Sequence, residues 1–142
     1  MIVLKPITRE NLEEVLSLKV KEDQEKYVIP NAESLSRAYV YSETAYPFAV
    51  YNDDTIVGFI MMGYYEVKGY YTLWEFMIDR KYQNKGYGTK IVEDLCNEYG
   101  LDCLWVNADN KKAIHVYEKY GFEIKEPTMY LMTRGDTYGS KL

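Results

Sequence analysis

Hydrophobic residues in the first third of the chain change their spacing from strand-like alternation to a helical repeat. Residues 2–8 (IVLKPIT) alternate as in a strand, and Thr8 is the expected N-cap of the helix that follows. The apolar positions of that helix fall on one face, namely Leu12, Val15, Leu16 and Val20. Residues 21–46 predict a second, less regular helical segment, with the helix itself expected after the break at Pro30.

The middle of the chain predicts a hairpin followed by another strand. Two apolar runs within residues 47–67 flank the turn sequence at 52–54 (NDD). Residues 70–79 (YYTLWEFMID) form the next expected strand, whose alternation gives two faces. One face carries Trp74, Phe76 and Ile78, and the other carries Leu73, Glu75, Met77 and Asp79. A carboxylate at Glu75 would therefore share a face with apolar residues, which is costly unless it is paired or hydrated.

The second half predicts helices that alternate with short strands. A helix begins after Gly86 and ends at Gly100, with Tyr87, Ile91, Leu95 and Tyr99 at four-residue spacing. A strand at 103–108, a helix at 110–120 and one or two strands within 122–134 follow, and residues 135–142 are expected to fray. This order predicts a mixed α/β fold with an antiparallel first half.

Composition narrows the class of protein. A chain of 142 residues fits one compact domain, so we expect residues 1–142 to form a single unit. The formal net charge of −5 argues against a nucleic-acid partner and suits a cationic one. No stretch of eighteen apolar residues and no basic leader is present, which predicts a cytoplasmic protein that does not associate with membranes.

Metal-ligating and nucleophilic residues are sparse. Cys96, Cys103 and His115 are too few for a usual zinc site, so we expect no metal and two reduced thiols. His115 stands among charged neighbours and is expected on the solvated side of its helix. A hydrolase triad is not expected, because the chain has no G-x-S-x-G elbow.

The stretch at residues 79–90 (DRKYQNKGYGTK) joins a strand to a helix through two glycines. Such a junction presents unpaired N–H groups at the positive end of a helix dipole and can hold an anion, with Lys85 adding charge from the side. Gly86 and Gly88 would let the backbone approach that anion closely. A dinucleotide fingerprint would need glycine where Ile91 stands. From these residues alone, phosphate binding and a glycine used merely to turn the chain both remain open.

Two stretches carry a resemblance to a known family. Residues 83–88 (QNKGYG) resemble the Gln/Arg-x-x-Gly-x-Gly/Ala motif of the GNAT superfamily of N-acetyltransferases. Residues 107–122 resemble its second signature, with Asn110, Ala113, Tyr117, Gly121 and Phe122 at the matching positions. The resemblance implies a GNAT-type mixed, largely antiparallel central sheet flanked by helices. It also implies an acetyl-CoA-dependent acyltransferase that forms a homodimer.

The same resemblance implies a cofactor site. In such proteins the diphosphate of acetyl-CoA lies on the amides of the glycine turn, and the pantetheine arm pairs with the fourth strand. By position, the implied residues are Phe76, Met77, Ile78, Gln83, Asn84, Lys85, Gly86, Tyr87, Gly88 and Thr89, with Asn110 and Ala113.

Two residues are candidates for the chemistry. An amine attacks a thioester as the neutral base, and the leaving thiolate needs a proton or a strong donor. Tyr117 stands where the family has its general acid, although the same helix face could make it a core residue. Glu75 could deprotonate or orient the amine, or could be an ordinary surface charge.

The acceptor is expected to be a small cationic amine. The segment at 18–30 (LKVKEDQEKYVIP) resembles bacterial spermine and spermidine acetyltransferases, and Gln24 and Tyr27 fit that resemblance, whereas Glu75 departs from it. The acids Glu22, Asp23, Glu25 and Glu43 could provide an acidic approach for a polyamine. The alternatives are acetylation of a protein N-terminus, a lysine or an antibiotic amine, and a non-catalytic sensor that binds acyl-CoA.

Overall fold

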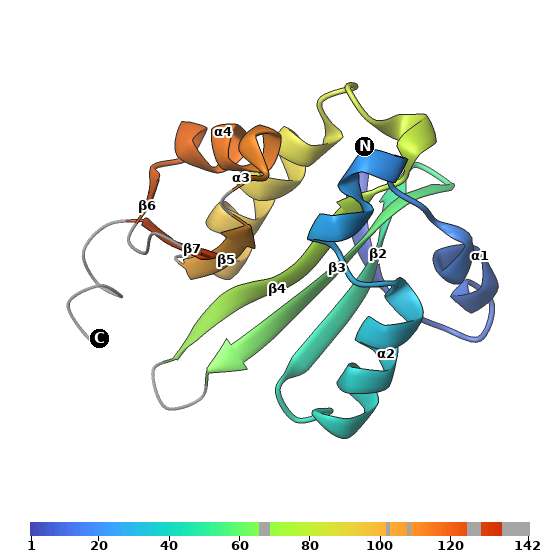
Figure 1. Ribbon diagram of the computed structural model, residues 1–142. Helices are drawn as coiled ribbons and strands as arrows, with labels where there is room; N and C mark the ends of the chain where they lie inside the picture. Colours follow the sequence, from blue (N-terminus) through green and yellow to red (C-terminus); the bar gives the residue numbers. More distant parts are fainter. Residues whose placement is uncertain (66–68, 102, 108, 125–128, 135–142) are drawn as a thin grey trace.

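The computed structural model describes residues 1–65, 69–101, 103–107, 109–124 and 129–134 (Figure 1). Within these residues, seven strands form one sheet in the order β1-β2-β3-β4-β5-β7-β6. The strands are β1 Ile2–Pro6, β2 Ala45–Asn52, β3 Thr55–Tyr65, β4 Tyr70–Ile78, β5 Cys103–Asn107, β6 Phe122–Ile124 and β7 Met129–Arg134. The prediction that residues 135–142 fray lies outside the described residues.

The sheet is mixed and largely antiparallel, as predicted. Strands β1 to β4 pair antiparallel in sequence order, β4 and β5 pair parallel, and β7 lies antiparallel between β5 and β6. The predicted hairpin is formed by β2 and β3, and Asp53 in its turn takes a left-handed φ of 54°. Tight turns between strands favour Asp, Asn and Gly because these residues tolerate that conformation.

Helices cover both faces of the sheet. They are α1 Leu12–Ser17, α2 Asn31–Val40, α3 Tyr87–Tyr99 and α4 Lys111–Lys119, with short 3₁₀ helices η1 Glu22–Tyr27 and η2 Arg80–Tyr82. Figure 1 shows α1 and α2 on one side of the sheet and α3 and α4 on the other. Successive residues of β3 point to opposite faces of the sheet and so contribute to two hydrophobic cores. Ile60 and Met62 pack in the core beneath α3 and α4 (the α3–α4 core), and Phe59 and Met61 pack in the core beneath α1 and α2 (the α1–α2 core).

The first helix is shorter than the hydrophobic pattern predicts. It ends at Ser17, and Val20 reaches the α1–α2 core from the non-helical segment that follows. Leu16, which the pattern placed on the buried face, lies within the helix but is 37% exposed. Regular helix begins at Leu12 with Asn11 as its N-cap, three residues later than expected. Thr8 still starts the turn, because the Asn11 N–H donates to Thr8 Oγ1 and the Thr8 N–H donates to Asn11 Oδ1.

A bulge in β4 corrects the predicted faces of that strand. Met61 pairs with Glu75 and Met62 pairs with Leu73, which leaves Trp74 without a partner on β3. The extra residue reverses the alternation, so Leu73 packs in the α3–α4 core and not on the face of Glu75 and Met77. The Trp74 indole lies over Gly63, where an added Cβ would come within 2.0 Å of the ring.

Strands β4 and β5 separate soon after they meet. Among the described residues they pair only at Thr72–Cys103 and Leu73–Leu104. Beyond this point β4 follows β3 to Ile78, while β5 follows β7 to Asn107. The edge of β4 that faces β5 therefore presents backbone N–H and C=O groups that no neighbouring strand satisfies, and such groups require another partner.

Candidate functional site

A cavity of about 760 Å³ lies where β4 and β5 separate. It is lined by β4, by η1 and the residues after it, by the glycine turn with the start of α3, and by α4. These segments come from four separate parts of the chain. The cavity size is within the range typical of small-molecule and cofactor sites.

Most of the residues that the sequence singled out line this one cavity. They are Gln24, Tyr27, Glu75, Phe76, Met77, Ile78, Gln83, Asn84, Gly86, Tyr87, Gly88, Thr89, Asn110, Ala113 and Tyr117. Three other predicted site residues, Glu22, Glu25 and Lys85, are exposed and do not line it. The structure thus brings the predicted reactive, anion-binding and acceptor residues together, but it leaves the predicted flanking charges at the periphery.

The glycine turn ends at the N-terminus of α3. Gly86 is the N-cap residue of this helix and takes a left-handed φ of 84°, a conformation that glycine adopts without strain. No side chain among the described residues caps the helix. A Cβ added at Gly86 or Gly88 would meet no atom within 4 Å, and both glycines line the cavity, so this turn borders open space. This end of a 13-residue helix can therefore receive an anion.

A lysine that the sequence analysis missed lies beside this turn. The Lys112 ammonium donates to Asn84 Oδ1 over 2.8 Å, and both side chains line the cavity. Lys112 belongs to the first turn of α4, 28 residues after Asn84. Its only sequence signal was its position next to Asn110 and Ala113 in the second signature. Lys85, the predicted cation, does not line the cavity.

Asn110 caps the helix on the opposite wall of the cavity. Its Oδ1 accepts a hydrogen bond from the Ala113 N–H at 3.4 Å, which satisfies one of the free amides of the first turn of α4. Asn110, Lys112 and Tyr117 all line the cavity, so the capped start of α4 forms part of its wall.

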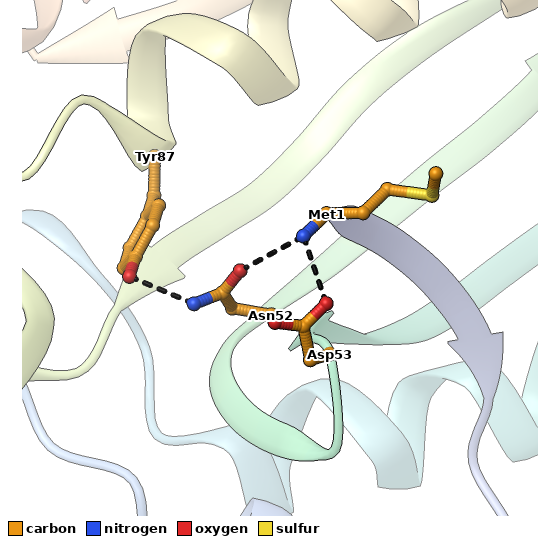
Figure 2. Close-up of polar contacts among 4 residues, drawn as sticks. All are labelled: Met1, Asn52, Asp53 and Tyr87. Carbon is orange, nitrogen blue, oxygen red and sulfur yellow. Dashed lines mark hydrogen bonds and ion pairs between the residues drawn. The ribbon is translucent and has the colours of Figure 1, made fainter.

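Tyr87 connects the start of α3 to the β2–β3 hairpin. Figure 2 shows its hydroxyl receiving a hydrogen bond of 2.9 Å from Asn52 Nδ2. The α-amino group of Met1 donates to Asn52 Oδ1 and pairs with Asp53 Oδ1 at 2.9 Å. The ion pair is exposed and contributes little by itself. Its neighbour Asn52 nevertheless holds the Tyr87 ring, which lines the cavity, against the end of the hairpin.

Glu75 is the one carboxylate on the described lining of the cavity. It is half-buried on β4, and burial raises its pKa to about 7, with a smaller contribution from the negative charge of Glu33. The backbone amide of Ile29 and the charge of Arg37 act in the opposite direction. A carboxyl group with this pKa is partly ionised near neutral pH and can both accept and release a proton.

Tyr117 is a core residue that also lines the cavity. Its side chain is 7% exposed, and its ring packs edge-on against Phe122 with the centroids 6.1 Å apart. Burial raises the pKa of its hydroxyl, and the negative charge of Glu75 raises it further. The hydroxyl forms no hydrogen bond with any described residue. It therefore remains a protonated donor that can reach a group within the cavity.

The segment η1 lies along the mouth of the cavity. Gln24 exchanges two hydrogen bonds with Gln83 of the glycine turn, and the Tyr27 hydroxyl donates to the Asp109 carbonyl, which precedes α4. The predicted acids of this segment are exposed. Glu43 is also exposed, beyond the far end of α2, and does not line the cavity. Lys26 and Lys112 line the cavity, so its described lining carries two ammonium groups and one carboxylate.

The remaining candidates from the sequence lie elsewhere. His115 is exposed on α4, and Cys96 is buried in the α3–α4 core. The side chain of Cys103 is outside the described part of the structure. No group of three or more His, Cys, Asp or Glu side chains that could hold a metal occurs among the described residues. No helix in the described ranges is long and apolar enough to cross a membrane.

Comparison with known proteins gives a consistent picture. The sequence model of a family described as "Acetyltransferase (GNAT) family" matches residues 10–122. The spermine/spermidine N(1)-acetyltransferase of Bacillus subtilis (strain 168) is 29% identical over 136 residues, which cover 86% of this chain and 88% of that protein. The family match spans most of the chain and includes both signature stretches.

Solved structures show the same fold. An acetyltransferase from Thermus thermophilus superposes with a TM-score of 0.68 at 18% identity, covering 94% of this chain and 96% of its own. Mutant forms of the spermidine/spermine N-acetyltransferase SpeG from Vibrio cholerae give a TM-score of 0.66 at 16% identity, with both chains fully covered. The ribosomal-protein-S18-alanine N-acetyltransferase of Escherichia coli gives 0.66 at 20% identity and covers 93% of this chain and 90% of its own. At these identities the similarity establishes the fold and not the acceptor.

Proposed function

The chain belongs to the GNAT family of acetyltransferases, and from this premise we propose that it transfers the acetyl group of acetyl-CoA to a primary amine of a polyamine. The observation that carries the proposal is one cavity that connects the open N-terminus of α3 with Glu75 and Tyr117. An anion-binding end and a proton-transferring end in the same cavity suit a phosphate-bearing acyl donor and an amine acceptor. The sequence-based expectations of one domain over residues 1–142, a homodimer and a cytoplasmic location stay predictions.

The described residues fit the acyl donor. The diphosphate would lie on the amides from Gly86 to Thr89, with Lys112 and Asn84 beside it. The unpaired edge of β4, from Phe76 to Ile78, can hydrogen-bond the amide groups of the pantetheine arm. Acetyl-CoA, when bound, supplies an activated acyl thioester.

Two side chains would serve the transfer itself. A primary amine arrives mostly as an ammonium ion, and Glu75, with a pKa of about 7, can take its proton so that the amine becomes a nucleophile. Tyr117 can donate a hydrogen bond to the departing sulfur. A thiol with a pKa near that of cysteine, about 8.5, is more acidic than the buried Tyr117 phenol, so the hydroxyl acts as a donor that keeps most of its proton.

The polyamine acceptor rests on two observations. The B. subtilis relative is a spermine/spermidine acetyltransferase by name, although at 29% identity the acceptor can differ. The exposed acids Glu22, Asp23 and Glu25 flank Gln24, which lines the cavity, so they place three negative charges beside it. Because these acids are solvated, they would attract a polycation through solvent and not by direct contact inside the cavity.

The alternative functions differ in how much they would depend on the acids beside the cavity. A protein N-terminus, a lysine side chain or an antibiotic amine would gain less from an acidic mouth, and a non-catalytic acyl-CoA sensor would release no thiol with any amine. Thiol release from acetyl-CoA with a panel of amines separates these cases. Turnover with aminoglycosides or peptides but not with polyamines would replace the proposed acceptor.

We expect spermidine to exceed a monoamine of similar length in kcat/KM at low salt, and we expect this advantage to shrink as salt is added. Each extra ammonium group gains attraction to the acids of η1, and this attraction is screened over a Debye length of about 10 Å at 0.1 M salt. The loss should occur mainly in KM. A salt series of kcat/KM for both amines measures it.

A matched pair of double variants tests the source of that advantage. Glu22→Gln with Glu25→Gln removes two charges at the mouth and should reduce the spermidine preference. Glu13→Gln with Glu98→Gln removes two exposed charges that do not line the cavity and should leave it unchanged. A preference ratio near one in the wild type at low salt would remove the polyamine assignment.

Glu75→Gln should remove the rise of kcat/KM that the wild type shows as the pH passes through about 7. Above neutral pH the variant should be slower by about tenfold, because the half-buried site still admits water that can accept a proton. Near pH 5 the two proteins should converge, since Glu75 is then protonated in the wild type. Parallel profiles over the whole range would exclude Glu75 as the base.

The melting temperature offers an independent check on the same pKa. A carboxyl group with a folded pKa of about 7 and a model value of 4.5 binds protons more tightly in the folded state, so its contribution to stability falls as the pH rises between these values. Relative to the wild type, Glu75→Gln should therefore be more stable at pH 8 than at pH 5. The opposite trend would show that the folded state favours the ionised form of Glu75 over the protonated form.

A further inference from the structure

The segment η1 has almost nothing apolar to hold it in place. None of its six residues is buried, although Gln24 and Tyr27 both line the cavity. A short 3₁₀ helix without buried side chains has little intrinsic stability, because helical turns of this length depend on tertiary contacts. The chain on either side of η1 is anchored in the α1–α2 core by Val20 and Val28, and the six residues between them are held over the cavity by polar contacts.

The most elaborate of these contacts is a reciprocal pair of side-chain amides. Gln24 Nε2 donates to Gln83 Oε1 at 3.1 Å, and Gln83 Nε2 donates to Gln24 Oε1 at 2.8 Å. The second N–H of Gln83 reaches the Ile78 carbonyl at 2.9 Å, and Gln24 Oε1 also accepts the Lys21 N–H at 3.2 Å.

These outer partners fix the direction of both amides. If Gln83 were flipped, its oxygen would face the Ile78 carbonyl, and a flipped Gln24 would place its NH₂ group against the Lys21 N–H. Only the observed orientation gives hydrogen-bond partners to both side-chain amides, to the Ile78 carbonyl and to the Lys21 N–H. The pair is thus specific and connects residues 59 positions apart in the sequence.

Further contacts attach the chain at both ends of η1. The buried Asp79 accepts the Lys19 N–H at 2.8 Å and the Lys81 N–H at 3.1 Å, which joins the chain before η1 to the chain after β4. At the other end, the Tyr27 hydroxyl reaches the Asp109 carbonyl, adjacent to the α4 cap. The segment η1 consequently bridges the two walls of the cavity, and Gln83 is its link to the turn proposed to bind the diphosphate.

We propose that the Gln24–Gln83 pair couples the two binding sites, so that an occupied glycine turn holds η1 in the arrangement that accepts the amine. In this view Gln24 is a positioning residue that acts through Gln83, and it determines acceptor affinity without contributing to the chemistry. The proposal rests on the function proposed above, because it assigns the glycine turn to the cofactor and η1 to the acceptor. Coupling of this kind is a difference in binding free energy and acts in both directions.

Hydrogen exchange with CoA alone tests the coupling without any acceptor. In the wild type, CoA should increase protection of the amides in residues 84–89 and also in residues 21–27. In Gln24→Ala, residues 84–89 should still be protected while the added protection of residues 21–27 is lost. Asn97→Ala, which removes an exposed carboxamide on α3 outside the cavity lining, should behave as the wild type.

The possible outcomes separate the two proposals. If CoA protects residues 84–89 but leaves 21–27 unchanged, or protects 21–27 equally in Gln24→Ala, the coupling is wrong and the cofactor site stands. If CoA protects neither segment in the wild type, the cofactor site proposed above fails and the coupling fails with it.

Steady-state kinetics with spermidine as the probe acceptor gives a second, independent test. Gln24→Ala should raise the acceptor KM about fivefold and change kcat much less. Gln83→Ala also removes the hydrogen bond to the Ile78 carbonyl beside the turn proposed to bind CoA, so it should raise the KM of both substrates. For the acceptor KM, the double variant should be no worse than Gln83→Ala alone, because the Gln24–Gln83 interaction is already absent there. Multiplicative effects, or a loss confined to kcat, would overturn the positioning role.

Discussion

Replacing Tyr117 by phenylalanine should lower kcat by about 10²-fold while CoA affinity changes little, because the change removes one hydroxyl and keeps the ring against Phe122. Tyr117 lines the cavity and its hydroxyl forms no hydrogen bond with the described residues, which leaves it available to the departing sulfur. Since burial and the charge of Glu75 both raise its pKa, it is a donor throughout the working pH range.

Stability distinguishes this role from that of a core tyrosine. Removal of a buried hydroxyl that no described residue binds leaves no partner unsatisfied, so the melting temperature should change by no more than about 2 °C. Tyr99→Phe is the control, because Tyr99 is half-buried against Tyr71 and does not line the cavity. Equal kcat in the wild type and Tyr117→Phe would show that Tyr117 only packs in the core and does not act in the transfer.

Gly86→Asp should abolish the thermal protection that CoA gives the wild type. At 100 times Kd a ligand stabilises by about 2.7 kcal/mol, which corresponds to a rise on the order of 8 °C in melting temperature for a domain of this size. The aspartate side chain would enter the open space in front of the α3 amides and place a negative charge where the diphosphate is proposed to lie. Measured with and without CoA, the shift should vanish in the variant.

Gly86→Asn separates charge from backbone strain. Asparagine has nearly the same shape as aspartate and pays the same cost at a φ of 84°, but it carries no charge. It should therefore retain part of the CoA-dependent shift. The folded state should survive in both variants, because an added Cβ meets no atom within 4 Å and Asp and Asn are among the residues that tolerate a left-handed φ. A full shift in Gly86→Asp would place the diphosphate elsewhere.

Local patterns predicted the parts of the site that consecutive residues build. The helix α3 begins and ends at glycines with left-handed φ, as expected from Gly86 and Gly100, because a backbone without Cβ is what those turns require. The two signature stretches supplied most of the cavity lining for the same reason: each is a short run whose backbone geometry follows from its own residues.

Errors arose where one extra residue or one missing turn changed the register. The bulge at Trp74 moved Leu73 to the other face of β4, and nothing in the run YYTLWEFMID distinguishes a bulged strand from a regular one. The helix that was expected to carry Val20 ended at Ser17, yet Val20 remained buried, since its side chain needs an apolar environment and not a helix.

The sequence by itself determined the element order, the glycine turn at the start of α3 and the residues around it, because these depend on backbone preferences over a few neighbouring positions. Only the tertiary structure decided that Lys112 and not Lys85 lies on the cavity lining, that Glu75 has a pKa of about 7, and that Gln24 is bound to Gln83. Each of these depends on burial or on a contact between segments far apart in the chain. Desolvation and side-chain hydrogen bonding act on distances in space, which the separation of residues along the sequence does not provide.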